Sequence, residues 1–173
     1  MPQPDLATVL ETVDLFASRD EDWEPAELSA ELRRTGWTVY RAGSTPYPSW
    51  LEKSGLQVAI LHGYEALGEV ALQISLEDWA GDWSAPESSS EYVRSVLAGY
   101  PAEIEESRRI GRELVAALSR RYPVSAEDHE RSDETFAFVF SESWRAGRAL
   151  LILGIEHLDP DDTPIELNLY VRH

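Results

Sequence analysis

An alternation of apolar and polar residues at 69–77 constrains the fold of this chain more than any other feature. In this segment, EVALQISLE, Val70, Leu72, Ile74 and Leu76 share one parity, and polar or small residues share the other. Successive side chains of a β-strand point to opposite faces of the sheet, so the pattern indicates a strand with one buried face. Such strands are typical of antiparallel sheets that are covered on one side.

Five further segments read as strands. The C-terminal segment alternates as cleanly, with Ile165, Leu167, Leu169 and Val171 on its apolar side. The predicted strands beside 69–77 cover about 37–42, 56–61, 135–140, 148–157 and 164–172. Their connections leave little room for the crossovers that parallel pairing requires. We therefore expect a mostly antiparallel, twisted sheet of about six strands.

Four segments have the spacing or the end residues of helices, at about 5–18, 25–35, 90–98 and 102–121. The last of these carries acids in its first turns and arginines later, which matches the helix dipole. The order of elements gives two three-strand meanders, each preceded by helices. The sequence therefore predicts a single α+β domain over residues 1–173, with the helices packed on one face of the sheet.

The other face of this sheet is not uniformly polar. Ala59, Leu61, Val139, Leu151 and Leu153 belong to apolar runs, and we expect residues of this group to face away from the helices. An apolar face has to be covered by a loop, a second subunit or a partner. Loops that contain tryptophan are the favoured cover.

The charge of the chain restricts its partners. The formal net charge is −17, from 32 acidic and 15 basic residues, whereas a small domain needs a magnitude of only about 2–8 for solubility. Nucleic acid and anionic membranes are disfavoured as partners because they bind clustered Lys and Arg. A basic protein is the partner that fits this charge, and a general need for solubility is the competing explanation.

Composition also indicates the compartment. The chain has no cysteine, which excludes disulfides and thiolate chemistry. No apolar run approaches the roughly 20 residues that span a bilayer, and the first residues do not have the pattern of a secretory signal. We expect a cytoplasmic protein that is a monomer or a homodimer. Fourteen of the 15 basic residues are Arg, which suggests GC-rich coding of the kind found in actinobacteria.

No motif in the sequence fixes a reaction. The glycine patterns that bind phosphate or dinucleotides are missing, and no serine lies in a Gly-x-Ser-x-Gly turn. The segment 159–166 begins like a calcium loop, but Pro164 and Tyr170 occupy the positions at which an EF-hand needs Gly and Glu. We predict no cofactor and no metal, and a binding protein is favoured over an enzyme.

An enzyme or a small-ligand binder is the alternative class. Its pocket would lie between the sheet and the helices, and it would need polar side chains that point inward. Tyr40, Arg41, His62 and Tyr170 are the candidates, although each also reads as an ordinary strand residue.

Tryptophans in acidic surroundings are the candidate partner-binding residues. Trp79 and Trp83 stand four residues apart in the segment LEDWAGDWSAPE at 76–87, and Trp23 lies in the acidic segment EDWEP. A ring flanked by carboxylates suits an Arg or Lys of another protein, through cation–π contact and ion pairing together. We expect a docking surface for a basic protein, made of Glu77, Asp78, Trp79, Asp82, Trp83 and Trp23. Trp37, at the start of a strand, is expected in the core.

In size, charge and lack of catalytic motifs, the chain resembles the small acidic immunity proteins that bacteria pair with secreted toxins. This resemblance is one of general type, and it implies a non-catalytic inhibitor or adaptor that neutralises a basic protein. The order of helices and meanders also resembles small acidic secretion chaperones, which hold a client along a sheet face. Such a chaperone would use the apolar sheet face and not the tryptophan segment.

Overall fold

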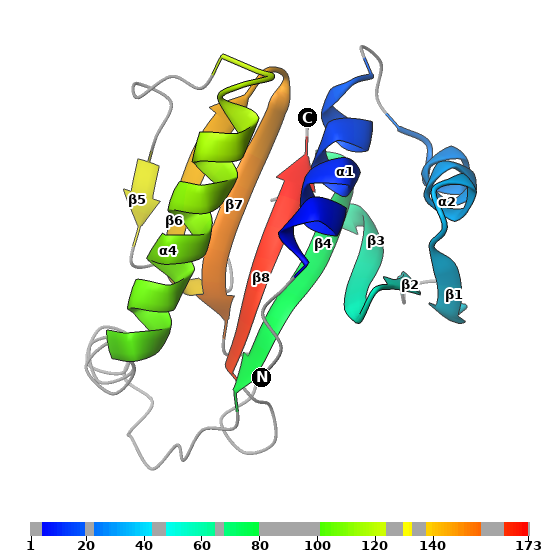
Figure 1. Cartoon of the computed structure of the whole chain (residues 1–173). Coiled ribbons are helices and arrows are strands. Elements are labelled where there is room, and N and C mark those ends of the chain that lie inside the picture. Colours follow the sequence, from blue (N-terminus) through cyan, green and yellow to red (C-terminus); the bar gives the residue numbers. More distant parts are fainter. Residues whose placement is uncertain are drawn as a thin grey trace.

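The computed structural model describes residues 5–19, 23–42, 48–64, 68–79, 101–123, 130–132, 138–156 and 165–172. They form an antiparallel sheet of eight strands, in the order β1-β2-β3-β4-β8-β7-β6-β5. Three helices, α1 (Leu6–Ala17), α2 (Pro25–Arg34) and α4 (Pro101–Leu118), lie on one face of this sheet (Figure 1). The chain therefore has the α+β architecture, with helices on one face, that its sequence predicts.

The sheet consists of two four-strand meanders that meet at its centre. The strands are β1 (Thr38–Arg41), β2 (Ser49–Lys53), β3 (Leu56–Tyr64), β4 (Gly68–Trp79), β5 (Glu130–Ser132), β6 (Phe138–Ala146), β7 (Ala149–Glu156) and β8 (Ile165–Arg172). Each meander follows the chain from an outer strand inward, and β4 pairs with β8 in the middle. Pairing of the last strand of each meander turns two local units into one sheet.

Tight turns hold neighbouring strands in register. Ser54 and Gly55 connect β2 to β3 and both have positive φ, of 53° and 80°. This conformation at both central residues is that of the type I′ hairpin turn, whose twist matches that of the strands. Gly147, with a φ of 61°, lies in the equally short connection from β6 to β7.

Local sequence explains where the helices begin. Asp5 caps α1, and its carboxylate accepts hydrogen bonds from the backbone N–H groups of Ala7 and Thr8 and, at 2.7 Å, from the Thr8 hydroxyl. Pro25 is the first residue of α2, where its missing N–H costs nothing. The register of these helices over the sheet is set by their buried residues.

The main core lies between the helices and the sheet. Its largest fully buried side chain is Trp144 of β6, which packs beneath α4 at Gly111. A Cβ atom added to Gly111 would lie 3.5 Å from the Trp144 ring and 3.4 Å from Leu153. The backbone of α4 at Gly111 therefore lies close to β6 and β7, with room for a Cβ atom but for no larger side chain. Trp37 is buried in the same core, as the sequence predicts.

Several expectations about the strands need correction. The sheet has eight strands, slightly more than the predicted number of about six, because β2 and β5 extend the two predicted meanders to four strands each. The predicted strand 135–140 is instead β6, which runs on through Trp144 to Ala146. The predicted helix at 90–98 lies outside the described residues.

The apolar residues expected on the outer face divide between the two faces. Ala59 and Leu61 do face away from the helices, where they pack with Ala71, Ile152 and Tyr170. The expectation is wrong for Leu151 and Leu153, which belong to the core under the helices. The side chain of Val139 lies outside the described part. The alternation of β4 and β8 is confirmed, with Leu72, Ile74, Leu167, Leu169 and Val171 all in the main core.

Candidate functional site

The ends of four neighbouring strands, β4, β8, β7 and β6, lie side by side at the lower end of the sheet in Figure 1. The register pairs Asp78 of β4 with Glu166 of β8, Glu166 with Glu156 of β7, and Glu156 with Phe138 of β6. We call this region the acidic end, and define it as Glu77, Asp78 and Trp79 of β4, Glu156 of β7, and Glu166 of β8.

Three acidic positions thus stand next to one another across three strands. Like charges at directly paired positions of a sheet repel and destabilise the pairing. The row Asp78–Glu166–Glu156 has a cost for folding unless protons, cations or a partner offset it. Sites of this kind are candidates for function because stability alone does not explain them.

The connecting segments that start or finish at this edge are acidic as well. Residues 80–100 follow Trp79, residues 133–137 precede Phe138, and residues 157–164 link β7 to β8. Together these three segments contain eight acidic residues and one basic residue, Arg94. Among the residues that the structure describes, acidic and basic residues are closer in number, with 18 acids and 14 bases. Most of the charge excess therefore lies outside the described residues, and much of it adjoins the acidic end in the sequence.

The structure describes four of the six predicted docking residues. Glu77, Asp78 and Trp79 are the last residues of β4, and Trp79 pairs with Ile165. Asp82 and Trp83 lie outside the described residues. The acidic end therefore brings together three of the six predicted residues.

Trp23 lies in the main core and not at the acidic end. Only 9% of its surface is exposed, and its ring centroid lies 6.5 Å from that of Phe16. The guanidinium carbon of Arg19 lies 4.4 Å from the centre of the Trp23 ring, and Arg19 also pairs with Glu27 at 2.9 Å. A cation of the chain itself thus makes the contact that the sequence suggested for a partner. This placement removes Trp23 from the docking surface.

A buried polar cluster adjoins the acidic end on the face away from the helices. The Tyr170 hydroxyl lies 2.9 Å from both carboxylate oxygens of Glu156, to which it donates a hydrogen bond. The Asn168 amide Nδ2 donates to Glu156 and, at 3.0 Å, to Glu166. Glu156 is 1% exposed and Asn168 is fully buried. Among the described residues, Glu156 has no ion-pair partner.

The surroundings of Glu156 favour its protonated form. Burial raises the pKa of its carboxyl group above the usual value of 4.5, and the negative charge of Glu166 raises it further. Hydrogen bonds from Asn168 and Tyr170 lower the pKa, but burial is the largest effect. A buried carboxyl group of this kind keeps its proton at a higher pH than a surface glutamate does.

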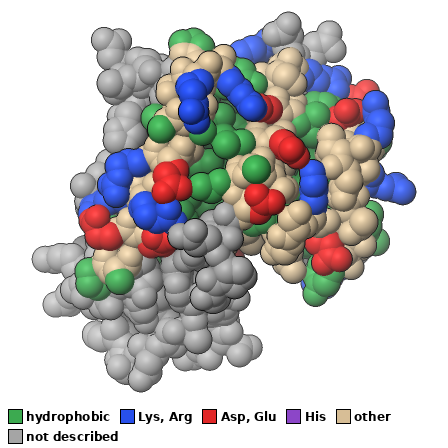
Figure 2. Space-filling model, viewed as in Figure 1, with side chains coloured by type: hydrophobic (Ala, Val, Ile, Leu, Met, Phe, Trp, Pro, Cys, Tyr) green, Lys and Arg blue, Asp and Glu red, His purple; other side chains and the backbone are tan. Residues whose placement is uncertain are grey.

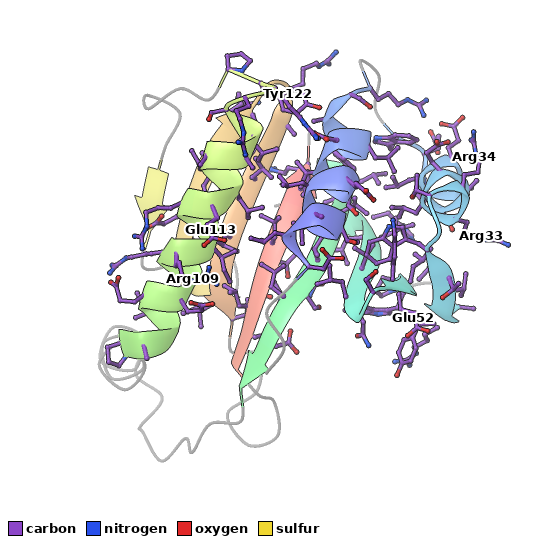
Figure 3. The ribbon with its side chains drawn as sticks, viewed as in Figure 1. Arg33, Arg34, Glu52, Arg109, Glu113 and Tyr122 are labelled. Carbon is purple, nitrogen blue, oxygen red and sulfur yellow. The ribbon has the colours of Figure 1, made fainter. Side chains whose placement is uncertain are left out.

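The helix face has a different electrostatic character. Figure 2 shows acidic and basic side chains interspersed over the helices. On α4, Arg109 bonds to Glu106 at 2.7 Å and also pairs with Glu113 (Figure 3). These bonds raise the pKa of Arg109 and lower that of Glu106. The charges of this face largely compensate one another.

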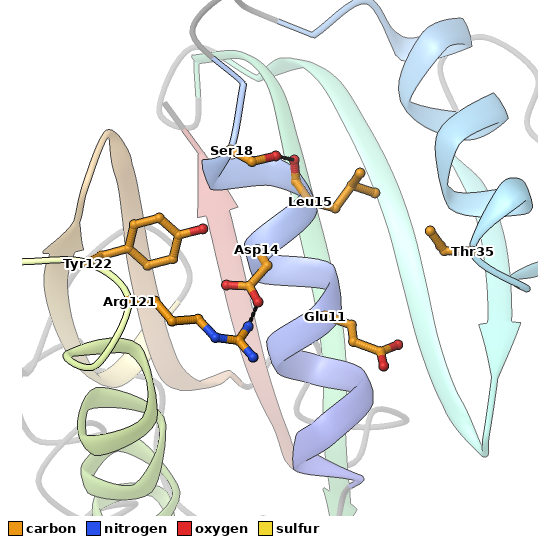
Figure 4. Close-up of a pocket in the computed structure, with 7 residues that line it drawn as sticks. All are labelled: Glu11, Asp14, Leu15, Ser18, Thr35, Arg121 and Tyr122. Atoms are coloured by element: carbon orange, nitrogen blue, oxygen red, sulfur yellow. Dashed lines mark hydrogen bonds and ion pairs between the residues drawn. The ribbon is translucent and has the colours of Figure 1, made fainter.

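An open groove of about 540 Å³ lies between the ends of the helices (Figure 4). It is lined by Glu11, Asp14, Leu15, Ser18, Thr35, Arg121 and Tyr122. The ion pair between Asp14 and Arg121 joins α1 to the residues after α4. The hydroxyls of Ser18 and Thr35 donate to backbone carbonyls of their own helices. Several polar groups of the groove thus already have partners within the chain.

The residues named for the alternative pocket do not converge. Tyr40, Arg41 and His62 are exposed, whereas Tyr170 is buried in the polar cluster. Sequence reasoning missed Glu156 and Asn168 as its neighbours. A glutamate that closes the apolar run at 149–155 was the available indication, since a strand with no polar alternation is buried on both faces.

Comparison with known proteins adds no relative: no family model, curated protein sequence or solved structure matches the chain. Within the described ranges, no group of three or more His, Cys, Asp or Glu side chains is arranged to hold a metal ion. In the same ranges, no helix combines the length and the apolar character needed to cross a membrane.

Proposed function

We propose that this protein is a non-catalytic binding domain that uses its acidic end to bind a basic protein, as an inhibitor or adaptor of the immunity-protein type. One observation carries the proposal. The strand register gathers acidic positions of β4, β7 and β8 at the same edge at which three acidic connecting segments begin or end.

Electrostatics explains why such an edge suits a basic partner. Asp78 and Glu166 are acidic residues at directly paired positions, and their repulsion is relieved when cationic side chains approach, so binding recovers free energy that folding has lost. Glu156 is 1% exposed and lies beneath this contact surface. A surface of one sign also accelerates the encounter with an oppositely charged protein. Trp79 lies at this end of the sheet and Trp83 follows it in the sequence, and tryptophan is one of the residues enriched at binding hot spots.

The helix face is a poorer candidate for binding a basic protein, because its charges are paired with one another. Its arginines and glutamates form pairs within the same helix, such as Arg108 with Glu105 and Arg34 with Glu31. Compensated charges exert a weaker field on a distant partner than charges of one sign do. The acidic end is therefore the better candidate for the contact with a basic protein.

Charge reversal at the acidic end tests the proposal. Wild type, the double variant Glu77→Lys/Asp78→Lys and the control Glu24→Lys/Glu52→Lys would be used as baits at low and high salt. The control residues are exposed and lie away from the acidic end. Each variant replaces two acids by two lysines, so both change the net charge equally. Captured proteins would be identified by mass spectrometry, and the dissociation constant of each purified candidate would be measured.

We expect a basic protein whose affinity falls at least tenfold in Glu77→Lys/Asp78→Lys and much less in the control. Circular dichroism would first confirm that both variants fold. Equal weakening in the two variants would show that only the overall charge matters. Failure of every bait to retain a basic protein would contradict partner binding itself.

A further inference from the structure

Strand β1 is one edge of the sheet, and β2 is its single neighbour among the described strands. All four residues of β1 are exposed. Among the described residues, Val39 and Tyr40 are the only large apolar side chains that are exposed, at 48% and 60%. The outer edge of such a strand has backbone N–H and C=O groups without partners in the sheet. β1 thus combines open hydrogen-bonding positions with apolar side chains beside them.

The opposite edge of the sheet is protected more strongly than β1. That edge is β5, which has three residues, and two of them, Glu130 and Arg131, are charged. Short strands and charged residues are the usual means by which edges avoid pairing with other chains. β1 contains two β-branched residues and a tyrosine, which favour strand pairing. The register shift between Val39 and Arg41 keeps the regular part of this edge short, so a short segment fits it better than a long strand.

Basic side chains lie at both ends of β1. Arg41 is its last residue, and Arg33 belongs to the last turn of α2. The backbone N–H of Trp37, just before β1, donates at 3.1 Å to the carbonyl of Leu32, so this turn adjoins the start of the strand. Figure 3 shows Arg33 on the side of α2 that faces away from the rest of the molecule. Both arginines are exposed, and neither forms an ion pair with a residue that the structure describes.

An extended acidic peptide fits these features better than the other candidate partners. Its carboxylates can pair with Arg33 and Arg41, and its backbone supplies donors and acceptors for the open edge of β1. The exposed acid Glu52 on β2 lies opposite Thr38 and pairs with neither arginine. Nucleic acid has the right charge but no regular row of backbone donors and acceptors. A second copy of the chain would bring the same unpaired arginines of two molecules toward each other, and like charges repel.

We propose that β1 binds an extended acidic segment of another protein as an additional strand of the sheet. The segment pairs with the outer edge of β1, and its apolar side chains contact Val39 and Tyr40. Salt bridges with Arg33 and Arg41 select acidic segments over neutral ones. This site is independent of the acidic end, because β2 and β3 separate β1 from β4 and the partner has the opposite charge.

A labelled synthetic peptide, in which glutamate alternates with valine or threonine, tests the site. Fluorescence anisotropy at low salt would measure its affinity for wild type, for Arg33→Glu/Arg41→Glu and for the control Arg112→Glu/Arg120→Glu. The control arginines are exposed and lie on α4 or just after it. Each variant replaces two arginines by two glutamates, so both change the net charge equally. A second peptide, with prolines at its central apolar positions, has the same charge but lacks the N–H groups that pair with a strand.

We expect Arg33→Glu/Arg41→Glu to weaken binding at least tenfold and the control to weaken it much less. The proline peptide should bind wild type at least tenfold more weakly than the first peptide, and this comparison needs no variant to fold. Equal affinity for the two peptides would overturn strand addition, and equal weakening in the two variants would overturn the assignment to β1. Failure of the first peptide to bind wild type at about 1 mM would overturn both.

Sedimentation and hydrogen exchange of the protein without peptide test the alternative occupant. We expect the amides of residues 38–41 to exchange rapidly in the protein alone and to be protected when the first peptide is bound. A dimer of the protein alone that protects these amides would assign the edge to a second copy and overturn the proposal.

Discussion

The Tyr170 hydroxyl lies 2.9 Å from both carboxylate oxygens of Glu156, on the neighbouring strand. Tyr170 pairs with Ile152 in the register, four residues from Glu156 along β7, so its side chain reaches along the sheet face to make this contact. Gly154, which lies between Ile152 and Glu156 on that face, presents no side chain in the way. The contact holds a buried carboxyl group beside Glu166, and the properties of the acidic end depend on it.

The protonation of Glu156 should be visible in the pH dependence of stability. Its pKa is raised in the folded protein, so the folded state binds this proton more tightly than the unfolded chain does. The resulting stability is fully present below the unfolded value of about 4.5 and is lost as the pH rises through the folded pKa. Glu156→Gln, which stays neutral, should lack this loss.

Urea unfolding between pH 5 and pH 8, in EDTA, measures this effect. Relative to wild type, Glu156→Gln should gain stability as the pH rises. A difference between the two proteins that stays constant over this range would show that Glu156 does not titrate there.

Asp5 should contribute to stability as the cap of α1. Asp5→Ala removes the acceptor for the N–H groups of Ala7 and Thr8 and should cost about 1 kcal/mol of unfolding free energy. Asp5→Asn keeps an acceptor oxygen and is the matched control, with a smaller expected loss. Hydrogen bonds from Thr8 lower the pKa of Asp5, so its contribution should fade as the pH drops through that lowered pKa. Chemical denaturation at pH 7 and at pH 3 would detect both effects.

Because α4 lies close to the sheet at Gly111, a small and a large side chain at this position should change stability in opposite directions. A Cβ atom there would make ordinary contacts with Trp144 and Leu153, so Gly111→Ala should be neutral or stabilise by up to about 1 kcal/mol through helix propensity. Gly111→Leu should destabilise by about 1–3 kcal/mol because the larger side chain overpacks the core. Urea titrations of the two variants test this. Equal stability of the two would mean that α4 can move away from the sheet.

The position of Trp23 predicts a structural role without a binding role. Trp23→Phe should lower the free energy of unfolding, because it removes buried ring area and weakens the contact with Arg19. It should leave the affinity for a basic partner within about twofold of wild type. Calorimetry of unfolding and of binding separates the two quantities. A tenfold loss of affinity with unchanged stability would return Trp23 to the docking surface.

Strands in which apolar and polar residues alternate could be predicted with the correct buried face, whereas strands without this alternation were predicted with wrong bounds or not at all. The alternation of β4 and β8 identifies their buried faces because each has one polar side. The predicted strand 135–140 ends before Trp144 because this residue stands among polar residues, whereas in the structure α4 covers the Trp144 ring and β6 continues. Strand β2 was missed because two prolines precede it, and the turn formers Ser54 and Gly55 were the overlooked indication.

Only part of the candidate site could be predicted from the sequence, namely the residues that are neighbours along the chain. Glu77, Asp78 and Trp79 stand out because they are consecutive. The proximity of Glu156, Glu166 and Asp78 depends on pairing between distant segments, and one residue of register shift would abolish it. Long-range register is a property of the whole sheet, which local patterns do not specify.

Mapping the contact surface by NMR would test the acidic end most directly. Amide shifts of the labelled protein would be followed while an octa-arginine peptide is added at low salt. If the acidic end is the docking surface, the largest changes will lie at the end of β4, the end of β7 and the start of β8, and Glu77→Lys/Asp78→Lys will suppress them. Changes spread evenly over the chain, or centred on the helix face, would contradict it.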